Sequence, residues 1–263
     1  MPIVRDASLG RRRLLKGLAC GCAFTASTAR AGPSSNAPRE GCALRGSQFR
    51  GVATEDDAQP LWNGATLLDP NAKDPQIRAL GIALDRMVQF SGHRPAFAFF
   101  NDSGAPNAYA SPERLVAGAE GTILFGRSLF RDAMSNYESH GFSVLMIIAH
   151  EFGHIAQFSS DKYDALFSLS DTSVLPELHA DFLAGFYLAE LDRMYAAMNN
   201  NFAARLMKDL GDFNIRSPDH HGTPDQRLKA SNAGYRFGRE GGLTYDGAVD
   251  LGAKFVVQNF WRR

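Results

Sequence analysis

The sequence predicts an α+β fold, mainly helical, in which a small sheet packs against one long apolar helix. Three observations support this prediction. The chain has 263 residues, 44% of them hydrophobic, which is enough for one large domain with a core. Short apolar runs separated by turn residues lie between residues 97 and 125. Helical spacing of apolar residues dominates after residue 141.

The first predicted elements are one helix and three strands. Pro75–Phe90 carries apolar residues at helical spacing, and Asp74 can cap its N-terminus. Phe97–Phe100 is followed by turn residues and predicts a strand, whose aromatic side chains we interpret as core packing. Asn107–Ala110 and Gly121–Phe125 predict two more short strands.

The second half of the chain predicts helices separated by polar segments. The first helix runs from Gly141 or Ser143 to about Phe158, and residues 159–173 are expected to form a loop. Pro176, which suits the first turn of a helix, opens a long helix that ends near Met198. Three further helices are predicted over residues 202–210, 224–237 and 246–260.

Residues 1–31 predict a signal peptide. Arg11-Arg12-Arg13-Leu14-Leu15-Lys16 resembles the twin-arginine export motif, and Ala29-Arg30-Ala31 provides a cleavage signal. The alternative is a cytosolic basic arm. The apolar stretch between these motifs is too short and too interrupted for a permanent membrane span. We therefore expect a periplasmic or secreted protein, cleaved near Ala31, with residues 32–60 as a loose N-terminal segment.

Charge and cysteine content bear on two questions, whether a nucleic-acid partner is indicated and whether disulfide bonds stabilise the fold. The formal net charge is zero, so the overall charge gives no indication of a nucleic-acid partner. Cleavage near Ala31 removes Cys20 and Cys22 and leaves Cys42 alone, so no internal disulfide is expected.

A His-Glu-x-x-His motif lies inside the helix predicted over residues 141–158. His150 and His154 are four residues apart on one helical face and can direct their imidazole nitrogens at one metal ion. Glu151 can hold a water molecule without binding the metal. The alternative is a buried helix that contains two histidines by chance. The flanking residues are almost all apolar, and burying two imidazoles and a carboxylate among them is costly unless a metal or hydrogen bonds compensate.

A catalytic zinc site needs a third protein ligand and an open position. The residue six positions after His154 is Ser160, which excludes a third histidine of the astacin type. Glu177 and Asp181 share one face of the next helix, whereas His179 points away from it. Glu177 is therefore the predicted third ligand and Asp181 the predicted hydrogen-bond acceptor for a ligand histidine. His179 is expected to be a surface or packing residue.

The combination of this motif with Glu177-Leu178-x-Ala180-Asp181-Phe182-x-Ala184-Gly185 resembles the neutral zinc metallopeptidases of the gluzincin clan, which includes thermolysin and the CAAX and heat-shock membrane proteases. Ala105–Ala110, followed by Gly121–Leu124, resembles the edge-strand region of these peptidases. His221-Gly222-Thr223-Pro224-Asp225-Gln226-Arg227 resembles their histidine-plus-arginine segment. The resemblance spans about residues 95–240 and implies a zincin-like fold. We expect the metallopeptidase domain to cover residues 61–240, with residues 241–263 as a C-terminal helical tail.

The resemblance also implies a mechanism. One Zn²⁺ per chain is held by His150, His154 and Glu177, and it acidifies a water molecule and polarises the scissile carbonyl. Glu151 takes the proton of the water and passes it to the leaving amine.

The remaining roles follow from the same resemblance. His221 is the implied donor to the developing oxyanion, with His220 as the alternative. Arg227 either assists there or ties its segment to the core. An extended peptide is expected to add to the sheet edge through main-chain hydrogen bonds. The implied substrate-binding residues are Asn107, Ala108, Tyr109 and Ala110.

The expected function is that of an exported, soluble, zinc-dependent endopeptidase acting on peptides or unfolded proteins. The alternative is a zinc-stabilised envelope chaperone or binding protein without turnover, and the intact Glu151 argues against it. A third interpretation is a structural helical domain without metal. Under this interpretation, the combination of all these residues would be a coincidence.

Overall fold

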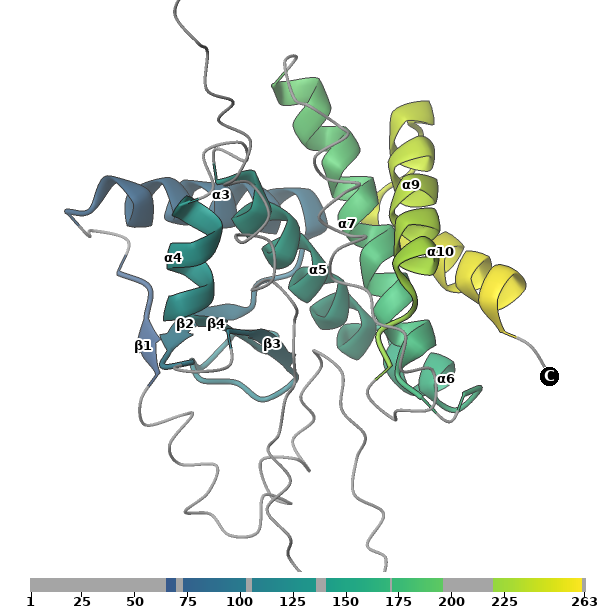
Figure 1. The fold of residues 1–263 in the computed structure, drawn as a ribbon, viewed down its shortest axis with the longest axis horizontal. Helices are drawn as coiled ribbons and strands as arrows, with labels where there is room; N and C mark the ends of the chain where they lie inside the picture. The colour runs from purple at the N-terminus through teal and green to yellow at the C-terminus, as the bar shows by residue number, and fades with distance from the viewer. Residues whose placement is uncertain are drawn as a thin grey trace, which may run out of the picture.

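The computed structural model describes residues 65–69, 73–102, 106–135, 141–170, 172–195 and 220–261. In these ranges one sheet lies on one side of a long helix, and further helices lie on the other side (Figure 1). The predicted signal peptide, the segment 32–60 with Cys42, and the helix predicted over residues 202–210 lie outside the described residues.

The sheet has four strands in the order β1-β2-β4-β3. The two central strands, β2 (Ala96–Phe100) and β4 (Thr122–Gly126), are parallel. The outer strands, β1 (Thr66–Leu67) and β3 (Ala108–Ser111), are antiparallel to their neighbours. The three predicted strands are confirmed. β1 was not predicted, because a strand of two exposed residues has no pattern to recognise.

Two helices flank the sheet region. The predicted α3 (Pro75–Ser91) is confirmed, and the carboxylate of Asp74 caps it by accepting from the backbone N–H of Gln76 at 2.8 Å. α4 (Arg127–Ser135) was not predicted. Its first backbone N–H groups donate to the carboxylate of Asp102, at 2.7 and 3.0 Å. Because this acceptor lies far away in the sequence, no local capping signal precedes the helix.

The long apolar helix α5 (Phe142–Ser159) lies between the sheet and the remaining helices (Figure 1). Residues of β3 and β4 share one buried cluster with α5, including Ala108, Phe125 and Ile148. The sheet therefore packs on α5, as predicted. The expected loop over residues 159–173 is wrong in part, because α6 (Lys162–Phe167) forms there and buries Tyr163.

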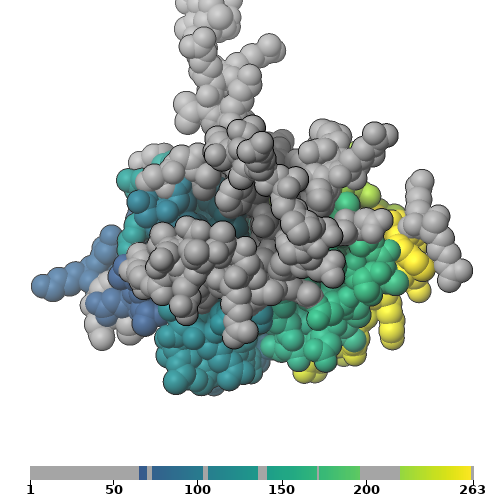
Figure 2. Space-filling model, turned by 90° about the horizontal axis from the view of Figure 1, so that it is seen from below, coloured from purple at the N-terminus to yellow at the C-terminus, as the bar shows by residue number. Residues whose placement is uncertain are grey.

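Three helices form the other side of α5. α7 (Val174–Met194) starts two residues before Pro176, and α9 (Pro224–Glu240) begins with a capping box from Thr223. α10 (Tyr245–Phe260) shares a buried cluster with α7, so the predicted C-terminal helix is packed into the core. Seen from below in Figure 2, the teal surface of the strand region lies beside the green surface of the helical region.

The coarse prediction of a mainly helical α+β domain is therefore confirmed. Among the described helices, none combines the length and the apolar character that crossing a membrane requires. The aromatic side chains of β2 are buried, as the interpretation of core packing requires.

Candidate metal site

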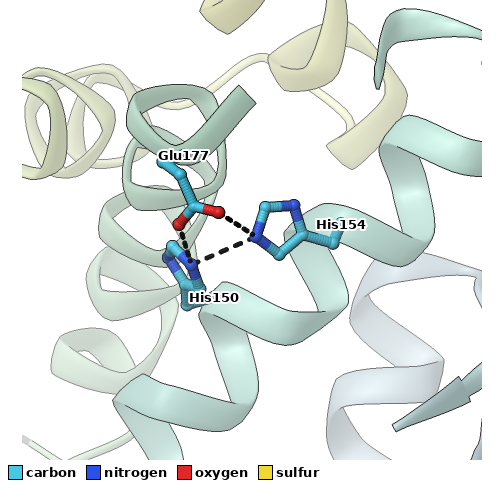
Figure 3. Close-up of side chains that lie close together, drawn as sticks. All are labelled: His150, His154 and Glu177. Atoms are coloured by element: carbon cyan, nitrogen blue, oxygen red, sulfur yellow. Dashed lines mark hydrogen bonds and ion pairs between the residues drawn. The ribbon is translucent and has the colours of Figure 1, made fainter. Parts of the chain in front are cut away.

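The two helices that pack at the centre of the molecule bring three polar side chains together. His150 and His154 project from α5 toward Glu177, which projects from the first turn of α7 (Figure 3). The Nε2 atoms of the two histidines lie 3.2 Å apart. The Glu177 carboxylate lies 3.2 Å from Nε2 of His150 and 3.5 Å from Nε2 of His154. One ligand atom from each residue lies within 4.8 Å of the others, so the group could hold one metal ion.

This proximity depends on a close crossing of α5 and α7 at Gly153. A Cβ atom at position 153 would lie 2.9 Å from Cα of Ala180, so only glycine allows this approach. Gly153 directly precedes His154, and Ala180 lies in the turn of α7 that follows Glu177. The crossing therefore sets the distance between the two helices at the position where their polar side chains meet.

A buried ion pair lies behind His150. Nδ1 of His150 is 2.9 Å from Oδ1 of Asp181, the position predicted to orient a ligand histidine. Arg227 of α9 donates to both oxygens of the same carboxylate, each at 2.7 Å. The side chain thus ties α9 to α7 at a buried carboxylate, as the second of the two predicted roles of Arg227 requires. Its other predicted role, assistance at the oxyanion, stays a prediction.

His154 is held on its other side by Gln157. Nδ1 of His154 lies 3.0 Å from Oε1 of Gln157, which is one helical turn further along α5. His179 lies 3.2 Å from the amide nitrogen of Gln157 and 2.9 Å from the carbonyl oxygen of Val249 in α10. His179 is 0% exposed, so of the two expected places, at the surface or in packing, the structure shows the second. As predicted, its side chain does not join Glu177 in the group of possible ligands. It contacts Gln157 and Val249 instead.

The electrostatics of the site follow from burial and close opposite charges. Burial alone would lower the pKa of His150, but hydrogen bonds and charges of Asp181 and Glu177 outweigh it and raise the pKa to about 10. Burial alone would raise the pKa of Glu177, but the nearby histidines hold it well below its usual range. Asp181 also stays ionised, because Arg227 and His150 lower its pKa against the effect of burial.

The donor set fits a cation. Each histidine turns Nδ1 to an oxygen outside the site and Nε2 into it, and both Nε2 atoms face the Glu177 carboxylate. Without a metal ion, the proton that the raised pKa keeps on His150 is the positive charge beside the Glu177 carboxylate. A cation that displaces this proton would meet three electron-pair donors in a buried position. Two imidazole nitrogens and one carboxylate are ligands that zinc accepts in catalytic sites.

Of the two predicted catalytic residues, Glu151 lies on α5 and His221 lies in the segment just before α9. Glu151 directly follows His150 on α5 and is 1% exposed. His221 is 5% exposed and close enough to Glu177 for its charge to lower the pKa of that carboxylate. The next residue, Gly222, has φ of 97°, a left-handed conformation that favours glycine, and a Cβ there would lie 2.8 Å from Leu178. His220 is also buried, and its carbonyl accepts from Ser173 at 3.2 Å.

The predicted substrate strand is the outer strand of the sheet next to α5. Ala108 and Ala110 of β3 pack into the cluster that includes α5, whereas Tyr109 packs on the other face beside Phe100. Asn107 is buried at the start of this strand, and its side-chain oxygen accepts from the next backbone N–H. β3 is thus placed at the sheet edge, as the predicted role requires.

Sequence reasoning did not identify Gln157 as part of the site. Its only signal was its position three residues after His154, which places the two side chains on neighbouring positions of one helical face. Compared with known proteins, the chain matches no family model, and neither a curated protein nor a solved structure is significantly similar to it.

Proposed function

We propose that the protein is a zinc-dependent endopeptidase with a zincin-like fold, related in its chemistry to the gluzincin peptidases. One observation carries the proposal. Two histidine nitrogens and a carboxylate converge in a buried position, and each histidine is held from behind by an oxygen acceptor. A ligand set with such supporting acceptors is typical of protein-bound zinc.

In this proposal His150, His154 and Glu177 hold the ion. When bound, zinc supplies Lewis-acid chemistry, because it lowers the pKa of a water molecule and polarises a carbonyl group. Asp181 keeps the ring of His150 in the orientation that turns Nε2 toward the site. Arg227 keeps Asp181 ionised and in place.

Glu151 and His221 supply the proton chemistry. The carboxylate of Glu151 is the general base, which takes a proton from water and gives it to the leaving amine. The imidazole of His221 is the candidate donor to the oxyanion that develops at the scissile carbonyl. Both side chains are almost fully buried, which strengthens their electrostatic effect on a bound substrate.

Substrate binding is assigned to the sheet edge. The outer strand β3 packs on the helix that carries His150 and His154, so a peptide added to this edge would run beside the proposed metal site. Main-chain pairing recognises an extended backbone and depends little on the side chains of the substrate. This suits peptides or unfolded proteins as substrates. The twin-arginine-like leader supports the further proposal that the protein is exported.

The test compares the parent with the Glu151→Gln variant. Zinc per chain is measured by elemental analysis, and cleavage is measured on denatured casein. A Glu190→Gln variant is the matched control, because Glu190 pairs with Arg193 on the surface of α7. We expect about one zinc per chain in all three proteins, cleavage by the parent and the control, and no cleavage by Glu151→Gln.

The other outcomes contradict the proposal in different ways. If all three proteins bind zinc and none cleaves, a zinc-stabilised binding protein without turnover explains the site better. Cleavage by the Glu151→Gln variant at the parent rate removes the general base from the mechanism. If the parent binds no zinc, the metal site itself is refuted.

A further inference from the structure

A continuous line of buried polar groups leads from His154 to the C-terminal helix. Beyond its contact with His154, the amide nitrogen of Gln157 lies 2.7 Å from the carbonyl oxygen of Pro176 and 3.2 Å from Nδ1 of His179. His179 in turn contacts the carbonyl oxygen of Val249 through Nε2, at 2.9 Å. The side chains of His154, Gln157 and His179 are 0% exposed, so water does not compete for these contacts.

The protons in this line can be assigned from its ends. A carbonyl oxygen only accepts hydrogen bonds, so the contact with Val249 requires a proton on Nε2 of His179. A neutral His179 then has a bare Nδ1, which accepts from the amide of Gln157.

The orientation of the Gln157 amide is fixed independently. The carbonyl oxygen of Pro176 and the bare Nδ1 of His179 both need a donor, and the amide NH₂ group has two N–H bonds to give. The opposite orientation would place the amide oxygen against two acceptors. Oε1 of Gln157 therefore faces His154, and Nδ1 of His154 must carry the proton.

The proton on Nδ1 determines which nitrogen of His154 can bind a metal ion. A neutral imidazole carries its proton on one nitrogen or the other, and only the bare nitrogen can bind a metal ion. With its proton on Nδ1, His154 presents a bare Nε2 to Glu177 and His150. The ring of His179 is also held tightly against α10, since a Cβ at Gly252 would lie 2.8 Å from it.

We propose that Gln157 and His179 are positioning residues, which fix the tautomer and the ring orientation of His154 and anchor them to the backbone of α10. The proposal rests on the metal site in the proposed function. It assigns α10 a role in that site, although α10 contributes none of the three proposed ligands. Partners behind a metal ligand typically affect metal affinity by 10–100-fold.

The test uses two substitutions of His179 that separate its two contacts. In His179→Asn, a side-chain amide atom takes the place of Nδ1, so the contact with Gln157 can form. In His179→Gln, the amide takes the place of Nε2, so only the contact with Val249 can form. Gln157→Leu removes the whole line with little change in volume. Val249→Ala is the control, because it shortens a buried side chain of α10 and keeps the carbonyl oxygen.

Two measurements on the full-length chain are needed. The Kd for Zn²⁺ is measured by competition with a chromophoric chelator, and the tautomer of His154 is measured by ¹⁵N NMR of the metal-free protein. We expect Gln157→Leu and His179→Gln to weaken zinc binding about 10–100-fold and to lose the fixed Nδ1–H tautomer. Val249→Ala should stay close to the parent in both measurements. His179→Asn, which keeps the contact with Gln157 and loses the contact with Val249, should fall between the parent and His179→Gln.

The positioning role is overturned if Gln157→Leu and His179→Gln bind zinc as tightly as the parent. It is also overturned if Val249→Ala weakens binding as much as His179→Gln, because general loosening of α10 would then explain both. If the parent binds no zinc, the proposed function fails, and the NMR measurement still tests the inference. A proton on Nε2 of His154 in the metal-free parent contradicts it, and an Nδ1–H that is lost in Gln157→Leu supports it.

Discussion

The buried ion pair between Asp181 and Arg227 provides the sharpest stability prediction. Both side chains are at most 1% exposed, and Oδ1 of Asp181 also accepts from His150. In Asp181→Asn one oxygen becomes an NH₂ group. With that group at either position it faces an N–H donor, so at least one hydrogen bond of Arg227 or His150 is lost.

The magnitude follows from the burial of the partner. Removing one member of a buried ion pair costs about 3–5 kcal/mol, because the remaining charge is left uncompensated. For a domain of this size, about 2–4 °C of melting temperature corresponds to each kcal/mol. We therefore expect Asp181→Asn to lower the melting temperature of the metal-free protein by about 6–20 °C, and to weaken zinc binding about 10–100-fold.

The same substitution at an exposed pair is the control. Asp250 contacts Lys162 at 2.8 Å, but its side chain is 63% exposed, so Asp250→Asn should change the free energy of unfolding by at most about 1 kcal/mol. Urea unfolding of the parent and both variants measures the difference. If Asp181→Asn loses no more stability than Asp250→Asn, the pair does not hold α7 and α9 together, and the reasoning is refuted.

The further predictions concern packing, pH dependence and metal binding. Tyr245→Phe should raise the free energy of unfolding by about 1 kcal/mol in urea, because the Tyr245 hydroxyl is buried and has no hydrogen-bond partner among the described residues. Gly185→Ala should lose about 2 kcal/mol or more in the same assay, because its Cβ would lie 2.0 Å from a carbonyl oxygen of α9. At Gly81 the nearest atom to an added Cβ would lie 3.9 Å away. Gly81→Ala should therefore raise the free energy of unfolding by up to about 1 kcal/mol, because alanine has the higher helix propensity. Burial raises the pKa of Tyr187 to about 12, above its usual value of about 10. The stabilisation that the neutral Tyr187 hydroxyl gives to the folded state is therefore complete below pH 10 and is lost as the pH rises toward 12. The decrease in the free energy of unfolding over this range, measured in urea, should be smaller in Tyr187→Phe. Free zinc at about 100 times the Kd of the parent should stabilise the parent by about 2.7 kcal/mol. A thermal shift of the same size in Glu177→Gln at the same zinc concentration would contradict the ligand assignment.

The side chains of the proposed metal site could be predicted from sequence because their grouping depends on helical spacing. His150 and His154 are one turn apart, as are Glu177 and Asp181, and these spacings place side chains on one face whatever the tertiary structure is. The structure brings all four together. What helical spacing cannot provide is the distance between the two helices.

The missed features depend on contacts between distant segments. α4 has its capping carboxylate at Asp102, in the loop after β2, so the local sequence gave no start signal. His179 was expected at the surface or in packing, because histidine at an isolated helical position carries no sign of its partners. Its contacts with Gln157 and Val249 come from two other helices, which only the fold brings near.

Close helix crossings connect the packing of α7 with the proposed site. On one side Gly153 of α5 meets the backbone of Ala180, and on the other a Cβ at Gly185 would overlap the backbone of α9. Because these contacts involve backbone atoms, α7 cannot shift along either neighbour without steric overlap. Glu177 is therefore held opposite His150 and His154 by the packing of the helices themselves. A site fixed in this way has its three donors in place before a cation arrives, so little binding energy is needed to rearrange the protein.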